Sequence, residues 1–80
     1  MNQNTTLFKE LAVGQTAKVT GFGLLGNAYR NRLMSLGLTL GTLFKVQHVA
    51  PFGDPVDIRV RGYHLSLRWS EIGNLEVEIL

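Results

Sequence analysis

Apolar and charged residues alternate strictly between residues 56 and 61. The apolar positions are Val56, Ile58 and Val60, and the charged positions between them are Asp57, Arg59 and Arg61. Successive side chains of a strand point to opposite faces of a sheet, so this period of two predicts a strand with one buried face. Gly62-Tyr63 then predicts a two-residue hairpin turn of type II′, after which Leu65 and Leu67 continue the buried face.

Three further segments alternate in the same way. They are residues 16–20 with Ala17 and Val19 inside, residues 42–50 with Phe44 and Val46 inside, and residues 75–79 with Leu75, Val77 and Ile79 inside. In the last of these strands Glu76 and Glu78 face outward, and we expect them to pair across strands with Arg59 and Arg61. Short helical turns are expected at residues 7–11 and 70–72.

One helix is predicted at about residues 27–36. Tyr29, Leu33 and Leu36 recur at helical spacing, Asn27 is a suitable N-cap, and Gly37 suits the left-handed residue that ends many helices. Five short strands in so few residues leave unpaired edges unless the sheet curls closed. The pattern therefore predicts a mostly β fold, a small five-stranded barrel with one inserted helix.

The length sets the scale of this fold. Eighty residues make one small domain with a thin core, and we expect residues 1–6 to be a flexible polar tail before a domain at 7–80. The chain has no cysteine, no apolar run long enough to span a bilayer, and no signal-peptide pattern at its start. We therefore expect a cytoplasmic protein. The net charge of +2 does not by itself indicate nucleic acid.

The segment Gly21–Gly26, GFGLLG, has the spacing of a dinucleotide-binding turn. That motif needs an acidic residue about 20 positions later for the ribose, and no acid occurs between Glu10 and Asp54. The simpler interpretation is a flexible connection between strand and helix. The serines, Ser35, Ser66 and Ser70, lack a nucleophile-elbow pattern. We therefore expect no enzyme and no cofactor.

Four side chains form the one candidate metal set, His48, Asp54, Asp57 and His64. Imidazole and carboxylate ligands suit a ferrous ion, but none of these residues has helical ligand spacing. Surface histidines and loop acids are the simpler interpretation, so we expect no resident metal. A weak iron-binding chaperone stays open as an alternative that requires the four side chains to converge.

A single-stranded nucleic-acid binder is the other alternative. The basic residues Arg30, Arg32, Arg59, Arg61 and Arg68 could line a groove in which Phe52, Tyr63 and Trp69 stack on bases. Acidic residues on the same segments balance these charges, which favours an ordinary solvated face. We expect no nucleic acid as partner.

The segment Leu24–Leu38 holds more apolar side chains than one helical face needs. Leu24, Leu25, Met34 and Leu38 cannot all enter so small a core. Either some remain exposed as a partner surface or they plug the end of the barrel. Trp69 raises the same question, since it is either a lid on the core or a contact anchor. Phe52, at a loop tip, is a second candidate contact.

Two motifs together resemble the FeoA family of small proteins of bacterial ferrous iron transport. The first is NRLMSLGLTLG at Asn31–Gly41, and the second is VAPFGDPVDIRVRGYHLSLR at Val49–Arg68. The chain departs from the family pattern at Leu40, where proline is usual, and at Trp69, where a basic or polar residue is commoner. Both departures add apolar surface.

The resemblance implies an SH3-like barrel that acts as a non-enzymatic accessory protein. Its expected partner is FeoB, the membrane permease with a cytoplasmic GTPase domain. We expect the contact surface to be bordered by Leu25, Tyr29, Arg30, Met34 and Trp69. Exposed leucines and an open barrel edge would also allow self-association.

Overall fold

The computed structural model describes residues 6–80. The strands are β1 (Thr6–Leu7), β2 (Thr16–Gly21), β3 (Leu43–Val49), β4 (Val56–Val60), β5 (Tyr63–Leu67) and β6 (Glu76–Ile79). The helices are the 3₁₀ turn η1 (Phe8–Glu10), α1 (Asn27–Ser35) and the single turn α2 (Trp69–Ile72). Of the predicted tail, only residue 6 lies within the described range.

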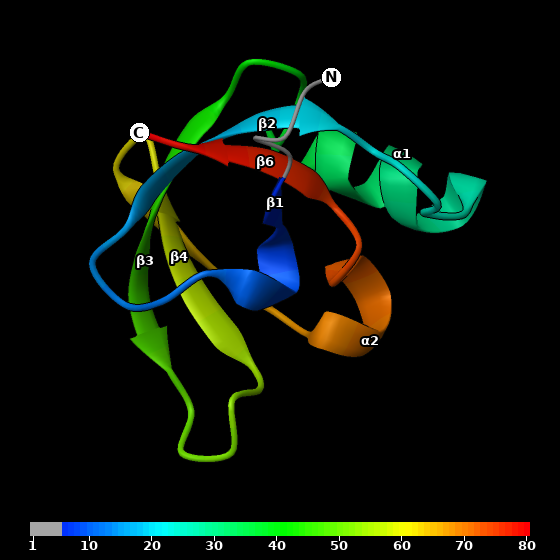
Figure 1. The fold of residues 1–80 in the computed structure, drawn as a ribbon. Coiled ribbons are helices and arrows are strands. Elements are labelled where there is room, and N and C mark those ends of the chain that lie inside the picture. The colour runs from blue at the N-terminus through cyan, green and yellow to red at the C-terminus, as the bar shows by residue number, and fades with distance from the viewer. Residues whose placement is uncertain (1–5) are drawn as a thin grey trace.

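The strands form one antiparallel sheet in the order β1-β6-β2-β3-β4-β5. The sheet curves strongly around the core, and α1 lies at one side of it (Figure 1). The sequence predicted five strands, and the additional one is the two-residue β1, in which Thr6 pairs with Val77. Two residues are too few to show an alternating pattern, so this strand had no sequence signal.

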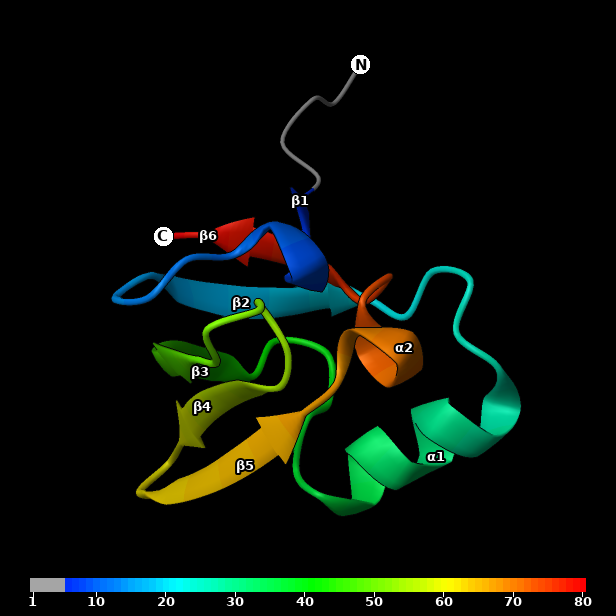
Figure 2. The same cartoon turned by 90° about the horizontal axis from the view of Figure 1, so that it is seen from below.

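The sheet is barrel-like but not closed, because its edge strands β1 and β5 do not pair with each other. The helical turns η1 and α2 lie against one another near this opening (Figure 2). The Phe8 N–H donates to the Leu75 carbonyl at 2.8 Å, and the Lys9 N–H donates to the Gly73 carbonyl at 3.2 Å. Both predicted helical turns are therefore present. They cover the core where β1 and β5 do not pair with each other.

The core is the inner face that the alternation predicted. Its members include Ala17, Val19, Phe44, Val46, Val56, Ile58, Val60, Leu67, Leu75 and Val77, all buried. Leu65 is partly buried against the same cluster. Ile79 is an exception, because it lies near the end of the last strand and stays 40% exposed.

The hairpin turn between β4 and β5 differs from the prediction. Its central residues are Arg61 and Gly62, with φ of 52° and 92°, and Val60 pairs with Tyr63. Two positive φ values make this a type I′ turn, whose twist matches that of the strands. The prediction of Gly62-Tyr63 as a type II′ turn was wrong by one residue. A glycine suits the first central position of a type II′ turn and also the second central position of a type I′ turn, so the residue type did not distinguish them.

The strand order also overturns the expected pairing of Arg59 and Arg61 with Glu76 and Glu78. Strand β4 lies between β3 and β5, whereas β6 lies between β1 and β2. Glu78 instead forms an ion pair with Lys18 of β2 at 3.3 Å. Alternation identifies which face a side chain is on, but it carries no information about which strand is the neighbour.

The helix α1 matches the predicted range to within one residue. Gly26, not Asn27, is its N-cap, and no side chain caps that end. At the other end Gly37 has φ of 96°, and the Leu38 N–H donates to the Leu33 carbonyl at 2.9 Å. This is a Schellman motif, in which the two leucines that it brings together are both buried.

Within residues 6–80, the structure contains no helix with the length and apolar character needed to cross a membrane.

Candidate partner-binding surface

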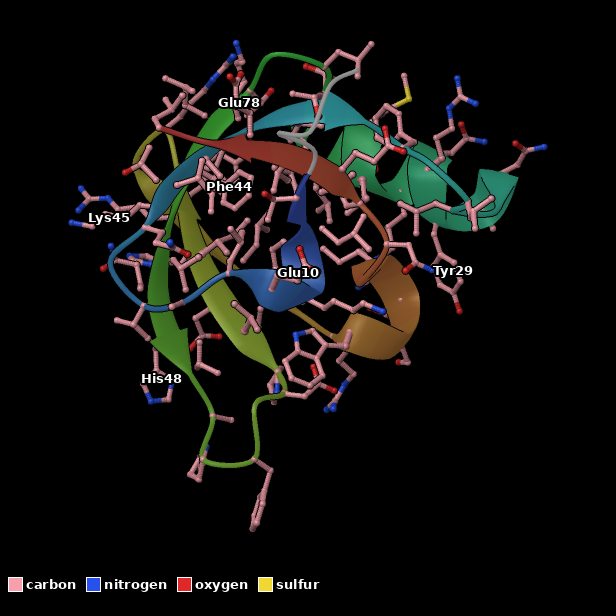
Figure 3. All side chains as sticks on the ribbon, in the orientation of Figure 1. Glu10, Tyr29, Phe44, Lys45, His48 and Glu78 are labelled. Carbon is pink, nitrogen blue, oxygen red and sulfur yellow. The ribbon has the colours of Figure 1, made fainter. Side chains whose placement is uncertain are left out.

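The helix α1 contributes little to the core. Leu33 is the buried residue of this helix, while Tyr29 is 42% exposed and Met34 is 44% exposed. In Figure 3 the labelled Tyr29 side chain projects from the helix away from the sheet. The apolar residues of this segment therefore do not all plug the barrel, and part of them face solvent.

The three predicted contact residues within α1 lie on two sides of Leu33. Arg30 and Met34 are four residues apart, so they share one flank of the helix, whereas Tyr29 lies on the other flank. Leu25 precedes the helix and is partly buried against the core. Arg30 and Met34 therefore lie together on one flank, and the buried face of the helix at Leu33 separates them from Tyr29.

The start of the α1 region is held by an aromatic contact. The Arg30 guanidinium carbon lies 5.4 Å from the centre of the Phe22 ring, a cation–π arrangement. Phe22 itself is packed partly against the core. This contact fixes one flank of α1 and leaves the neighbouring Met34 side chain exposed.

The other flank of α1 is tied to the rest of the molecule at two points. Arg32 Nη1 donates to Glu71 Oε2 of α2 at 3.1 Å. The Tyr63 hydroxyl at the start of β5 donates to the Leu36 carbonyl at the end of α1. The helix is therefore positioned by polar contacts from two elements, although a single side chain of it is buried.

Trp69 is the fifth predicted contact residue. The contacts that position it come from the loop at residues 50–55 and not from α1. Its ring packs beside Gly53, where an added Cβ would lie 2.6 Å from Trp69 Cη2. Its backbone N–H donates to Asp54 Oδ1 at 2.8 Å. Trp69 is 39% exposed, so it covers the loop at residues 50–55 and still presents part of its ring to solvent.

The two most exposed large apolar residues of the described part of the chain are not among the five predicted contact residues. Leu24 is 90% exposed in the turn before α1, and Phe52 is 94% exposed at the loop tip. The sequence signal for Leu24 was the surplus of apolar residues in its segment, but the pattern could not say which leucine stays outside. Leu38 of the same surplus is fully buried. Leu40, one of the departures from the family pattern, is 62% exposed.

The four residues of the metal alternative do not converge. His48 Nδ1 lies 3.7 Å from Asp57 Oδ2, while Asp54 Oδ1 accepts a hydrogen bond from the Trp69 amide. The structure of residues 6–80 holds no group of three or more His, Asp and Glu side chains that could bind a metal ion. The labelled His48 points outward from β3 in Figure 3. The geometry does not favour an iron-binding chaperone.

The nucleic-acid alternative also lacks its geometry. Tyr63 is tied to the Leu36 carbonyl and Trp69 packs beside Gly53, so both rings are already in contact with other parts of the chain. The arginines are dispersed, because Arg32 pairs with Glu71 and Arg30 lies over Phe22. An electrostatic groove with successive stacking platforms is not formed.

The glycine-rich segment 21–26 is a connection with an acid against it. The Glu76 carboxylate lies beside Gly21 and Gly23, where it would meet an added Cβ at either residue. A carboxylate at this position would repel a phosphate. Gly21 also forms part of a bulge in the pairing of β2 with β6. The interpretation of this segment as a strand-to-helix turn is therefore supported.

Comparison with known proteins agrees with this fold. The family model described as the FeoA domain matches residues 7–79. The solution structure of the FeoA protein from Chlorobium tepidum is 39% identical, with a TM-score of 0.84 over 94% of this chain and 70% of that one. The zinc complex of FeoA from Stenotrophomonas maltophilia, described as a procaryotic SH3 domain protein, is 28% identical with a TM-score of 0.76 over 91% and 89%.

A curated relative extends the comparison. The Fe(2+) transport protein A/Fe(2+) transporter FeoB fusion protein of Porphyromonas gingivalis is 34% identical over 74 residues. The match covers 89% of this chain and 8% of that protein, so the chain corresponds to a small part of the fusion. The fold is thus SH3-like, and the match to nearly all of the chain establishes that it belongs to the FeoA family.

Proposed function

We propose that this chain is a non-enzymatic accessory protein of bacterial ferrous iron uptake that acts in the cytoplasm by binding the GTPase part of FeoB. The observation that carries the proposal is the Porphyromonas gingivalis fusion, in which a segment similar to this chain is joined to FeoB. A fusion supplies each part to the other at high effective concentration, which suits partners that also associate as separate chains.

The surface proposed for this contact is bordered by Leu25, Tyr29, Arg30 and Met34 of the α1 region and by Trp69 of α2. Aromatic, methionine and arginine side chains are enriched at protein interfaces, and few of them dominate the binding energy. Met34 and Trp69 are partly exposed and partly packed, so a partner would bury apolar area with little loss of side-chain freedom.

The experiment is a titration of detergent-solubilised full-length FeoB with the full chain, measured by biolayer interferometry. Met34→Asp and Trp69→Ala should each weaken binding at least about tenfold, as loss of an interface anchor does. The matched control is Val13→Asp, because Val13 is 57% exposed in the segment that joins η1 to β2. This segment lies on the opposite side of the molecule from α1 (Figure 1).

Two results would contradict the proposal at different levels. No binding of the unmodified chain would argue against FeoB as the partner. Unchanged binding of both folded variants, or equal losses in Val13→Asp, would argue against the α1 surface while leaving FeoB in place.

A further inference from the structure

A second surface lies on the outer face of the sheet, on strands β3, β4 and β5. Lys45 of β3, Arg59 of β4 and His64 of β5 are directly opposite one another across the three strands. Residues directly opposite share a face, and all three are exposed. In Figure 3 the labelled Lys45 side chain points outward from β3. These three residues are called the basic row.

Within residues 6–80 no member of the basic row takes part in an ion pair, although Asp57 lies on the same face, two residues from Arg59 along β4 and directly opposite Ser66. The ion pairs within residues 6–80 join Lys18 to Glu78 and Arg32 to Glu71, and His48 Nδ1 lies 3.7 Å from Asp57 Oδ2. None of these contacts includes a member of the row. Like charges directly opposite one another destabilise a sheet. The fold therefore retains an unfavourable arrangement of Lys45 and Arg59 that an acidic group from outside would relieve.

The row ends at an unpaired sheet edge. Strand β5 pairs with β4 on one side and has no strand on the other, at one margin of the sheet (Figure 2). Because Val60 and Tyr63 close a two-residue hairpin, they form a hydrogen-bonded pair, and the pairs then alternate along the ladder. The N–H and C=O groups of His64 and Ser66 consequently point to the free edge.

This edge lacks three of the features that usually prevent strand addition. Tyr63–Leu67 contains no proline and no lysine, and its pairing with β4 has no register shift. By contrast, the pairings of β2 with β6 and of β3 with β4 are both interrupted by irregularities. The edge is therefore a regular template of main-chain donors and acceptors.

We infer that β5 binds an extended acidic segment of another protein by strand addition, with acidic side chains of that segment lying beside His64 and Arg59. Main-chain hydrogen bonds to His64 and Ser66 supply affinity, and alternate side chains supply specificity. This surface includes none of the five residues proposed to contact FeoB and does not depend on the function proposed above.

This face carries two cations, Lys45 and Arg59, against one acid, Asp57, and this excess of positive charge favours an acidic protein segment over other occupants. A second copy paired through β5 would place two basic rows in one sheet. Nucleic acid would need aromatic platforms, but the rings of Tyr63 and Trp69 are engaged at Leu36 and Gly53.

The probe is a blocked seven-residue peptide in which glutamate alternates with valine, titrated into the isotope-labelled full chain and followed by NMR. The amide signals of His64 and Ser66 should shift and their hydrogen exchange should slow. The same peptide with lysine in place of glutamate should bind at least about tenfold more weakly, because it faces the row with like charge.

Variants test the two parts of the surface separately. Arg59→Glu should weaken binding of the glutamate peptide about fivefold to tenfold, and Lys9→Glu, with the same change in net charge, should leave it within about twofold. Ser66→Pro should abolish binding and keep the fold, because the Ser66 N–H is not used in the ladder. Ser66→Ala is its control and should bind normally.

Several outcomes would overturn the inference. These are an absence of shifts in β5, equal binding of the lysine peptide, unchanged binding by Arg59→Glu, and tighter binding of a thymidine oligonucleotide at low salt. Slow exchange of His64 and Ser66 that depends on protein concentration without peptide would identify a second copy as the occupant instead.

Discussion

The β4–β5 hairpin and the helix α1 use their apolar residues in opposite ways. In the hairpin Val56, Ile58, Val60 and Leu67 are buried. In α1 a single residue, Leu33, is buried, and the helix is positioned through its ends and through Arg32. The hairpin is therefore stabilised by its own side chains, whereas α1 depends on a few contacts and leaves apolar surface available to a partner.

The largest effect that tests this comparison is expected at Leu33. Leu33→Ala removes the buried anchor of α1 and should lower the free energy of unfolding by about 2–5 kcal/mol. The neighbouring Met34→Ala should change it by less than about 0.5 kcal/mol, because Met34 is 44% exposed. Urea denaturation followed by Trp69 fluorescence measures both, and comparable losses would mean that α1 is not held by one anchor.

Glycines with positive φ at the end of α1 and in the hairpin turn should differ in their tolerance of alanine. At Gly62 an added Cβ meets nothing within 4 Å, so Gly62→Ala should cost only the left-handed conformation, about 1–2 kcal/mol. At Gly37 the Cβ would also meet the Tyr63 hydroxyl and disturb its hydrogen bond to Leu36, adding about 0.5–1.5 kcal/mol.

The Tyr63→Phe background provides the control for Gly37. If the excess cost arises at the Tyr63 hydroxyl, removing that hydroxyl should bring the cost of Gly37→Ala down to that of Gly62→Ala in thermal unfolding. An excess that persists in this background would place its origin within the helix end itself.

The smallest effect is expected on the outer face of the hairpin. Lys45→Glu replaces a like charge opposite Arg59 by an opposite one and should stabilise the protein by about 0.5–1 kcal/mol. Lys18→Glu makes the same change opposite Glu78, where it breaks an ion pair, and should destabilise the protein by a similar amount. Equal responses of the two variants would show that net charge, not register, decides the outcome.

Much of the fold could be predicted because strand faces are encoded locally. The inner positions of β2, β3, β4 and β6 were predicted correctly, with Ile79 as the exception, as were the single helix and both short turns. The order of strands could not be predicted, because alternation is the same whichever strand lies alongside. The expected pairing of Arg59 with Glu76 failed for this reason.

The candidate surface was less predictable than the core. The surplus of apolar residues in Leu24–Leu38 indicated that some stay outside, and the structure shows that Leu24 and Met34 do while Leu38 does not. Four of the five predicted contact residues come from residues 25–34 and the fifth, Trp69, from α2, and they lie on different flanks and elements. Their joint role in binding remains a proposal that the variants above test.

By itself the sequence determined the local structure of this protein, namely which residues face inward, where the helix begins and ends, and which family its motifs resemble. The tertiary structure decided what lies beside what. In the folded protein the sheet is open between β1 and β5, and Lys45 lies opposite Arg59, which in turn lies opposite His64. Asp54 accepts a hydrogen bond from the Trp69 amide. The physical reason is that burial follows from the period of a single segment, whereas neighbours are set by pairing between segments far apart in the chain.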